Sequence, residues 1–324
     1  MKAIYGIVAV LSVLQTAGHA AAQASYPEQT VRILVGFTPG VAPDIVGRLL
    51  ADKFSEAWGR PVVVENVTGA AGNIATDRVA KATPDGHILL MGGNASLIFG
   101  PSIYEKLPFD PIKDFAPISQ IFVAANILVV PNETPAKALP ELVALARAQP
   151  GKLTYAHAGA GTSQHLAAEL FKSMAHIDIQ PVAYRGTTHL LPDLLAGRVT
   201  MSFANIVNIL PLMREGKLRA FAVTSIKRSA VVPDLPTMAE SGYPGFEAVP
   251  WFGLMAPAGT SPAIIEKIHR EAVRALAMPD VRRRLNELGL DIIGGSPTEL
   301  AVVIEREIPQ WAKVIKEIGI KASE

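Results

Sequence analysis

The sequence predicts an α/β protein with two domains. Short β-branched and aliphatic runs alternate with stretches that carry apolar residues at helical spacing, which favours helices layered on a mainly parallel sheet. The chain has 324 residues, and 49% of them are hydrophobic. Because one hydrophobic core rarely holds so long a chain, we expect two domains rather than one.

The first predicted domain opens with strands that alternate with helices. Three short apolar runs, typical of buried strands, lie at 31–35, 62–64 and 88–91. Between the first two, apolar residues recur at helical spacing from 45 to 54, with Pro43 suited to the first turn and Asp44 to the positive end of the helix dipole. Another helix is expected to end near Lys81.

A second alternating set begins near Phe122. We expect strands at 127–130, 153–156, 181–184, 199–203 and 220–223, and helices at 139–148, 163–174 and 190–195. Pro and Gly are dense between 231 and 257, which fits a crossing back to the first domain. Ser261-Pro262 and Ser296-Pro297-Thr298-Glu299 then mark the starts of two helices, the second with a capping box.

Residues 1–24 have the pattern of a cleavable signal peptide. Lys2 precedes an apolar stretch from 4 to 14, and small residues end at Ala24. Cys is absent, so disulfides, a lipid-anchor cysteine and thiolate chemistry are excluded. Basic and acidic residues balance once Lys2 is removed, which argues against nucleic acid or an anionic membrane as a partner. We expect an exported, soluble protein.

Three loops of Gly, Ala, Ser, Thr and Pro interrupt the apolar runs, at 37–44, 92–96 and 158–163. Each lies where a predicted strand is followed by a helix. Unpaired backbone N–H groups and the positive end of the helix dipole meet at such a point and favour bound anions. The loops therefore predict a protein that binds small anions.

Other activities fit these loops less well. Gly159-Ala160-Gly161 lacks the third glycine of a dinucleotide fingerprint, since Gln164 stands there, so no nicotinamide cofactor is expected. A secreted hydrolase that uses Ser163 and His165 stays as an alternative, although the run lacks the final glycine of a nucleophile elbow. The histidines show no metal-binding spacing, so no metal is expected.

These loops and other segments resemble the solute-binding receptors of tripartite tricarboxylate transporters, also called Bug receptors. The likeness covers essentially all of residues 26–320. The matching segments are 35–40 with Asp44 and Arg48, 61–66, 69–73, 84–86, 107–110, 161–171, 184–186, Asp193-Leu194, and 233–237 with Glu240.

The resemblance implies a type II periplasmic binding-protein fold, in which two α/β lobes are joined by two crossover segments with a ligand cleft between them. Lobe 1 would comprise 25–125 and 245–324, and lobe 2 would comprise 126–244. The protein would be a periplasmic monomer, not an enzyme, that binds a small organic carboxylate by lobe closure and delivers it to the membrane subunits of a transporter. Alternatively, the same receptor would serve a signalling membrane protein.

In relatives the loop that corresponds to 37–44 holds a ligand carboxylate, and the loop at 159–165 would close over it. This chain has Val41 where a second glycine is usual and Pro43 where Thr or Ser is usual, which is expected to reshape the carboxylate loop. Asn205 replaces a frequent acidic residue, which favours ligands without an ammonium group. The candidate ligand-binding residues are Phe37, Pro39, Gly40, Val41, Ala42, Asp44, Gly93, Asn94, Ala95, Ser96, Gly159, Ala160, Gly161, Thr162, Ser163, His165, Tyr184, Arg185, Gly186 and Asn205.

Overall fold

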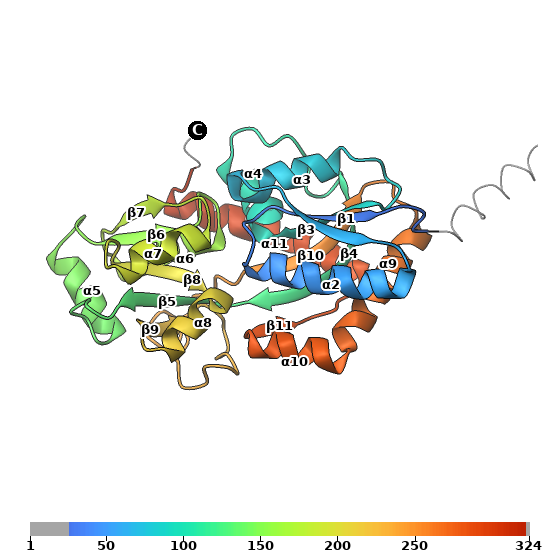
Figure 1. Cartoon of the computed structure of the whole chain (residues 1–324). Helices are drawn as coiled ribbons and strands as arrows, with labels where there is room; N and C mark the ends of the chain where they lie inside the picture. Colours follow the sequence, from blue (N-terminus) through green and yellow to red (C-terminus); the bar gives the residue numbers. More distant parts are fainter. Residues whose placement is uncertain (1–25, 322–324) are drawn as a thin grey trace, which may run out of the picture.

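The computed structural model describes residues 26–321, so the expected signal peptide lies outside the described residues. Two mixed β-sheets, each covered by helices, stand side by side (Figure 1). The predicted α/β class is confirmed.

The first sheet has the strand order β11-β4-β10-β3-β1-β2. Its strands are β1 (Val31–Val35), β2 (Val62–Asn66), β3 (Ile88–Gly93), β4 (Phe115–Ala124), β10 (Trp251–Pro257) and β11 (Leu290–Ile292). Strand β1 pairs in parallel with β2 and β3, as predicted, whereas β10 runs antiparallel to both β3 and β4. The expected burial of β2 is only partly right, because this edge strand leaves Val63 43% exposed.

The second sheet has the strand order β7-β6-β8-β5-β9. Its strands are β5 (Asn126–Pro131), β6 (Thr154–His157), β7 (Gln180–Ala183), β8 (Met201–Asn205) and β9 (Leu218–Val223). Strand β6 is parallel to β7 and β8, and β5 is antiparallel to β8 and β9. The expectation of parallel pairing is therefore wrong for β5. The strand before it in the chain, β4, belongs to the first sheet, so β5 enters the second sheet from the first.

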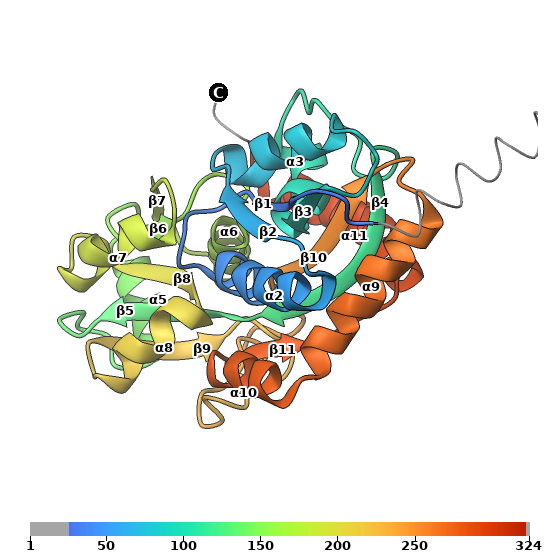
Figure 2. The same ribbon diagram turned by 45° about the vertical axis from the view of Figure 1, so that its right-hand side comes forward.

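The helices cover both faces of the two sheets. Those beside the first sheet are α2 (Ala42–Trp58), α3 (Asn73–Ala80), α4 (Gly100–Ile103), α9 (Pro262–Ala277), α10 (Pro279–Glu287) and α11 (Pro297–Ile318). Those beside the second are α5 (Leu139–Ala148), α6 (Ser163–Ala175), α7 (Thr187–Leu195) and α8 (Ile206–Arg214). Figure 2 shows α2, α9 and α10 together at one face of the first sheet, where their apolar side chains share one core.

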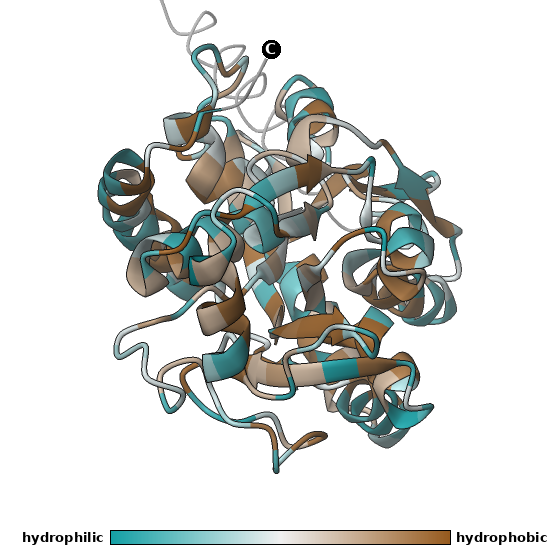
Figure 3. Ribbon diagram, turned by 90° about the vertical axis from the view of Figure 1, so that its left-hand side faces the viewer, coloured by the Kyte–Doolittle hydropathy of each residue, from teal (hydrophilic) through white to brown (hydrophobic). Residues whose placement is uncertain are grey.

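Hydrophobic residues concentrate on the strands and on the inward faces of the helices (Figure 3). The helix starts that the sequence marks are confirmed. Ser261 caps α9 by accepting from the Ile264 N–H. At α11 the Ser296 hydroxyl accepts from the Glu299 N–H at 3.2 Å, while the Ser296 N–H donates to Glu299 Oε2 at 2.7 Å. Both helices therefore begin where their side chains satisfy first-turn amides.

The chain passes between the two sheets twice. Strand β4 leads into β5 through Ala125, and the long ribbon of this first crossing is visible in Figure 1. The second crossing, residues 224–250, leads from β9 to β10. The sequence places this crossing at 231–257, but residues 251–257 instead form β10 between β3 and β4, and Trp251 there is 3% exposed.

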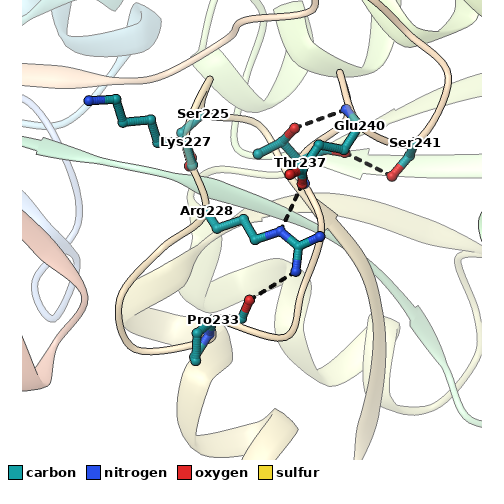
Figure 4. A network of polar contacts seen from close by, with 7 residues as sticks. All are labelled: Ser225, Lys227, Arg228, Pro233, Thr237, Glu240 and Ser241. Carbon is teal, nitrogen blue, oxygen red and sulfur yellow. Dashed lines mark hydrogen bonds and ion pairs between the residues drawn. The ribbon is translucent and has the colours of Figure 1, made fainter.

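A network of polar contacts shapes the second crossing (Figure 4). Arg228 Nε donates to Glu240 Oε2 at 2.9 Å, and its Nη1 donates to the Pro233 carbonyl at 3.1 Å. Thr237 and Glu240 exchange two bonds, since the Thr237 N–H donates to Glu240 Oε2 and the Glu240 N–H donates to Thr237 Oγ1. The Met238 N–H also donates to the Val223 carbonyl, which ties the segment to β9.

Candidate functional site

A cavity of about 1140 Å³ lies between the two sheets, and loops from both sides line it. Residues from the side of the first sheet lie at 36–38, 41–43, 68–71, 94–95 and 102–106. Residues from the side of the second sheet lie at 158–160, 162–164 and 184–187. Asn126, Asn205, Pro250, Phe252 and Lys321 complete the lining. We call this cavity the cleft.

Four helices begin at the cleft. The residues that precede their first turns are Val41 for α2, Thr162 for α6, Gly186 for α7 and Asn205 for α8, and all four line the cavity. Unpaired first-turn N–H groups and the positive ends of four helix dipoles thus surround one space. Two of these helix starts have side-chain caps, since Thr162 accepts from the His165 N–H and Asn205 from the Val207 N–H. The arrangement favours an anion.

Asp44 organises the first loop but does not line the cleft. Its carboxylate accepts from the Gly40 N–H at 2.9 Å, from Arg48 Nε at 3.0 Å and from Asn66 Nδ2 at 2.9 Å. Burial alone would raise the pKa of Asp44, but these hydrogen bonds outweigh burial and hold that pKa below its ordinary value. Pro39 and Gly40 likewise do not line the cleft, whereas Phe37, Val41 and Ala42 do.

Val41 and Pro43 affect the backbone of this loop differently. Val41 has φ −95° and ψ 166°, while Gly40 takes the positive φ of 82°, so valine is accommodated without strain. Pro43 has no N–H, and the Asp44 N–H donates to the Val41 carbonyl at 3.0 Å. The first turn of α2 therefore offers the cleft only the amides of Val41 and Ala42.

The segment 68–71 also lines the cleft, although the sequence analysis does not assign it to the site. Ala70 and Ala71 have φ of 45° and 53°, a left-handed conformation that non-glycine residues rarely adopt. The backbone approaches closely here, because a Cβ on Gly36 would lie 2.5 Å from Gly72 Cα. The glycines that flank the two alanines were the available signal of an unusual backbone.

The loop at 158–163 is held by its own hydrogen bonds. The Ala158 N–H donates to Gln164 Oε1 at 3.0 Å, and the Gly161 N–H donates to His165 Nδ1 at 3.2 Å. His165 and Gly161 are not part of the lining, whereas Gly159, Ala160, Thr162 and Ser163 belong to it.

The geometry of this loop does not suit a hydrolase. His165 is turned toward the Gly161 amide, and its ring stacks on that of His157 with centroids 4.4 Å apart. Ser163 Oγ instead accepts from Asn126 Nδ2 at 3.2 Å. Among residues 26–321, no hydrogen bond joins Ser163 to a histidine base.

The predicted loop at 92–96 contributes only Asn94 and Ala95 to the lining. Asn94 Nδ2 donates to the Val249 carbonyl at 3.0 Å, and Ser96 Oγ accepts from Thr76 Oγ1 at 2.9 Å. Gly93 and Ser96 lie outside the lining. A Cβ on Gly93 would approach the Trp251 carbonyl to 2.7 Å, so glycine here permits the pairing of β3 with β10.

Charged side chains at the cleft are mostly cationic. Lys106, Arg185 and Lys321 line it and are exposed, with Glu105 as the acidic counterpart. Of these, only Arg185 is a candidate from the sequence, whereas Glu105 and Lys106 follow α4 and Lys321 lies at the end of the described chain. The positive rim adds to the preference for an anion.

Tyr184 lines the cleft but directs its hydroxyl to another group. The phenol donates to Asp193 Oδ2 at 2.7 Å, and Asp193 also accepts from Arg198 Nη1 at 2.7 Å. Burial, followed by the hydrogen bond to Asp193, raises the pKa of Tyr184 to about 12. The phenol is therefore neutral at physiological pH, and its ring is the part available to a ligand.

The two walls of the cleft touch each other. Asn208 Nδ2 on α8 donates to the Gly40 carbonyl at 3.2 Å, and Tyr104 Oη donates to the Ala160 carbonyl at 3.3 Å. Gly186 lies so close to Thr38 that a Cβ on it would be 2.9 Å from Thr38 Oγ1. These contacts depend on the relative position of the two sheets.

Two further properties concern only the described part of the chain. No helix within residues 26–321 is both long enough and apolar enough to cross a lipid bilayer. In the same residues, no three His, Cys, Asp or Glu side chains come together as metal ligands.

Comparisons with known proteins agree with this geometry. The family described as "Tripartite tricarboxylate transporter family receptor" matches residues 46–320. Protein BugT of Bordetella pertussis is 36% identical over 97% of this chain and 98% of its own length. The structure of R. palustris Rpa4515 with adipate has a TM-score of 0.88 at 35% identity and covers 92% of this chain and 100% of that one. MatC from Rhodopseudomonas palustris with bound malate has a TM-score of 0.85 at 35% identity and covers 90% of this chain and 100% of its own.

Proposed function

Because this chain belongs to the receptor family of the tripartite tricarboxylate transporters, we propose that it binds a small organic carboxylate in the cleft and delivers it to the membrane subunits of such a transporter. The family and its solved members are solute-binding receptors rather than enzymes. They are also periplasmic receptors, and the proposal gives this chain the same location. The hydrolase alternative is not supported.

One observation carries the proposal of an anionic ligand. Helices α2, α6, α7 and α8 all begin at the same cavity and present first-turn amides to it from both sides. Each helix N-terminus stabilises a negative group by about 0.3–1 kcal/mol, and by up to about 2 kcal/mol in a partly buried geometry. Several such contacts, with charge-assisted hydrogen bonds, are compatible with micromolar affinity for a carboxylate, about −8 kcal/mol.

The proposal treats each sheet with its helices as one lobe. Lobe 1 comprises residues 25–125 and 245–324, and lobe 2 comprises residues 126–244. The lobes would close over the ligand as rigid bodies, with the Asn208 to Gly40 and Tyr104 to Ala160 contacts formed in the closed state. Ligand binding would stabilise this state without a chemical step, in a receptor that acts as a monomer.

The proposed ligand-binding residues are those candidates that line the cleft. They come from three loops of lobe 1 and two of lobe 2, together with the asparagines at the start of β5 and the end of β8. They are Phe37, Val41, Ala42, Asn94, Ala95, Gly159, Ala160, Thr162, Ser163, Tyr184, Arg185, Gly186 and Asn205, to which we add Thr38, Ala70, Ala71 and Asn126.

Calorimetric titration of the purified mature protein with a panel of mono-, di- and tricarboxylates tests the proposal. The panel includes adipate and malate, and uncharged alcohols of the same carbon skeletons serve as controls. We expect at least one acid to bind at micromolar concentration and to raise the melting temperature as its free concentration exceeds Kd. A folded protein that binds none of the acids would refute the proposal.

A further inference from the structure

Two asparagines lie side by side at the floor of the cleft. Asn126 at the start of β5 and Asn205 at the end of β8 are direct partners in the antiparallel register. Opposed residues in such a pair have Cα atoms about 4.5–5.5 Å apart and carry their side chains on the same face. Both asparagines line the cleft, and Asn126 is 0% and Asn205 8% exposed.

The hydrogen bonds of Asn205 determine which amide atom it can offer. Its Oδ1 accepts from the Val207 N–H at 3.2 Å as the N-terminal cap of α8. The cap holds this oxygen toward the first turn of α8, and the amide nitrogen is the donor that remains for the cleft. Asn205 therefore presents N–H groups to a ligand.

Asn126 presents the complementary atom. Its Nδ2 donates to Ser163 Oγ at 3.2 Å, its backbone N–H donates to Thr224 Oγ1, and its carbonyl accepts from the Thr224 N–H. Its Oδ1 is buried and has no hydrogen-bond partner among residues 26–321. Buried polar atoms are nearly always paired, so an unpaired acceptor at a binding cleft indicates a donor on the ligand.

We propose that Asn126 and Asn205 together recognise a hydroxyl group, so that the ligand is a hydroxycarboxylate. This inference rests on the proposed function and specifies the ligand of the same cleft. The ligand hydroxyl would donate to Asn126 Oδ1 and accept from Asn205 Nδ2.

Other groups match this pair less well. A carboxylate would place an acceptor against Asn126 Oδ1, and an ammonium group would face the N–H donors of Asn205. A methylene group would leave both asparagines unpaired. Only a neutral group that donates and accepts at once satisfies both side chains.

The opposite wall provides a place for the carboxylate. Thr38 lines the cleft beside the first turn of α2, and its buried Oγ1 also has no hydrogen-bond partner among the described residues. Its O–H can donate to a carboxylate that the amides of Val41 and Ala42 also reach. The carboxylate would thus bind at lobe 1 and the hydroxyl at the asparagine pair.

The test compares acids that differ only by a hydroxyl group. Calorimetry would be run with malate against succinate, 2-hydroxyglutarate against glutarate, 3-hydroxybutyrate against butyrate, and lactate against propionate. We expect the hydroxy acid of at least one pair to bind at least about tenfold more tightly, because a site with polar groups arranged for a hydroxyl rejects the analogue that lacks it. Equal affinities within every pair that binds would overturn the inference and leave the proposed function standing, whereas no binding by any acid would refute the proposed function itself.

Variants connect the preference to the asparagines. Asn126→Ala should lose the preference for the hydroxy acid over its deoxy analogue. Asn205→Ser should lose it too, because serine can still cap α8 but has no amide donor. This second variant keeps the test decisive if Asn126→Ala does not fold. Asn132→Ala, at an exposed asparagine outside the cleft, should retain the full preference, and an unchanged preference in both cleft variants would overturn the inference.

A third variant reverses the chemistry. Asn126→Asp places a carboxylate where the amide oxygen lies, which favours an ammonium group over a hydroxyl. We expect this variant to bind the amino acid analogue, aspartate in place of malate or glutamate in place of 2-hydroxyglutarate, better than the wild type does. A variant that binds the amino acid no better than the wild type would contradict the assigned role of Asn126.

Discussion

The buried histidine pair predicts a loss of stability in mildly acidic solution. His157 and His165 stack beside the loop at 158–163, and their Nδ1 atoms accept from the Gly159 and Gly161 N–H groups at 3.3 and 3.2 Å. A ring nitrogen that accepts a hydrogen bond carries no proton, so both rings are neutral in this arrangement. Protonation would break the two bonds that hold the loop.

The groups around the two histidines determine the direction in which their pKa values shift. Burial and then the adjacent His165 ring lower the pKa of His157 from 6.5 to about 4. Burial and then Lys172 lower the pKa of His165 from 6.5 to about 4. Glu169, which accepts a hydrogen bond from the Tyr155 phenol, is the nearby acidic group and favours the protonated form of His157, but burial outweighs it.

The magnitude of the stability loss follows from the linkage between protonation and folding. In the unfolded chain both histidines titrate near pH 6.5, so above that pH neither state is protonated and the full stability is present. As the pH falls from 6.5 to about 4, the unfolded chain takes up protons that the folded protein refuses, and the free energy of unfolding decreases. At pH 5 the loss is about 2 kcal/mol for each histidine, and the two losses are not strictly additive because the rings interact. Below about pH 4 this contribution is fully lost.

Urea denaturation followed by circular dichroism at pH 7.5, 6 and 5 measures the effect. We expect the midpoint to fall with pH, and the fall to be about halved in His165→Asn, whose amide oxygen can still accept from the Gly161 N–H but does not titrate. His189→Asn, at an exposed histidine, serves as the matched control and should behave as the wild type. An equal decline in wild type and His165→Asn would refute the reasoning.

Three further outcomes are expected. Gly186→Ala should weaken ligand binding by about tenfold without unfolding the protein, because its Cβ would lie 2.9 Å from Thr38 across the cleft and oppose closure. An unchanged affinity in calorimetry would contradict this expectation. Tyr184→Phe should lower the urea midpoint slightly, because Asp193 loses a hydrogen bond, and should leave affinity nearly unchanged; a large loss of binding would show that the hydroxyl contacts the ligand. Ser296→Ala should cost about 1 kcal/mol through loss of the α11 cap, with Ser296→Asp as a stable control, and equal melting temperatures for Ala and wild type would argue against it.

Local patterns predict much of the fold. The strands β1 and β3, the helices α5 and α6 and the capped start of α11 lie where the sequence indicates. Their signals come from residues a few positions apart, namely apolar periodicity and side-chain caps. Interactions over such short separations are readable without knowledge of the remaining structure.

Elements that depend on distant partners are less predictable. Trp251–Pro257 reads as part of a Pro- and Gly-rich crossing, yet it forms β10 because β3 and β4 leave a place between them. Helix α8, which the sequence analysis does not predict, contains Pro211 in its interior. Val63 is exposed because β2 lies at the edge of the sheet, and strand order is not encoded locally.

The same division applies to the candidate site. The loops at 37–44 and 158–163 are recognisable because small residues between a strand and a helix are needed wherever an anion meets a helix start. Local sequence does not distinguish Gly159, which lines the cleft, from Gly161, which does not line it and whose amide donates to His165.

The residue order of this chain thus specified strands, helix starts and the chemical preference for an anion, since all three arise from neighbours along the backbone. Folding added the pairing of Asn126 with Asn205 within the second sheet and the contacts between the two walls. Both features come from segments far apart in the chain, and the wall contacts exist only once both sheets have formed and the crossings have brought them face to face.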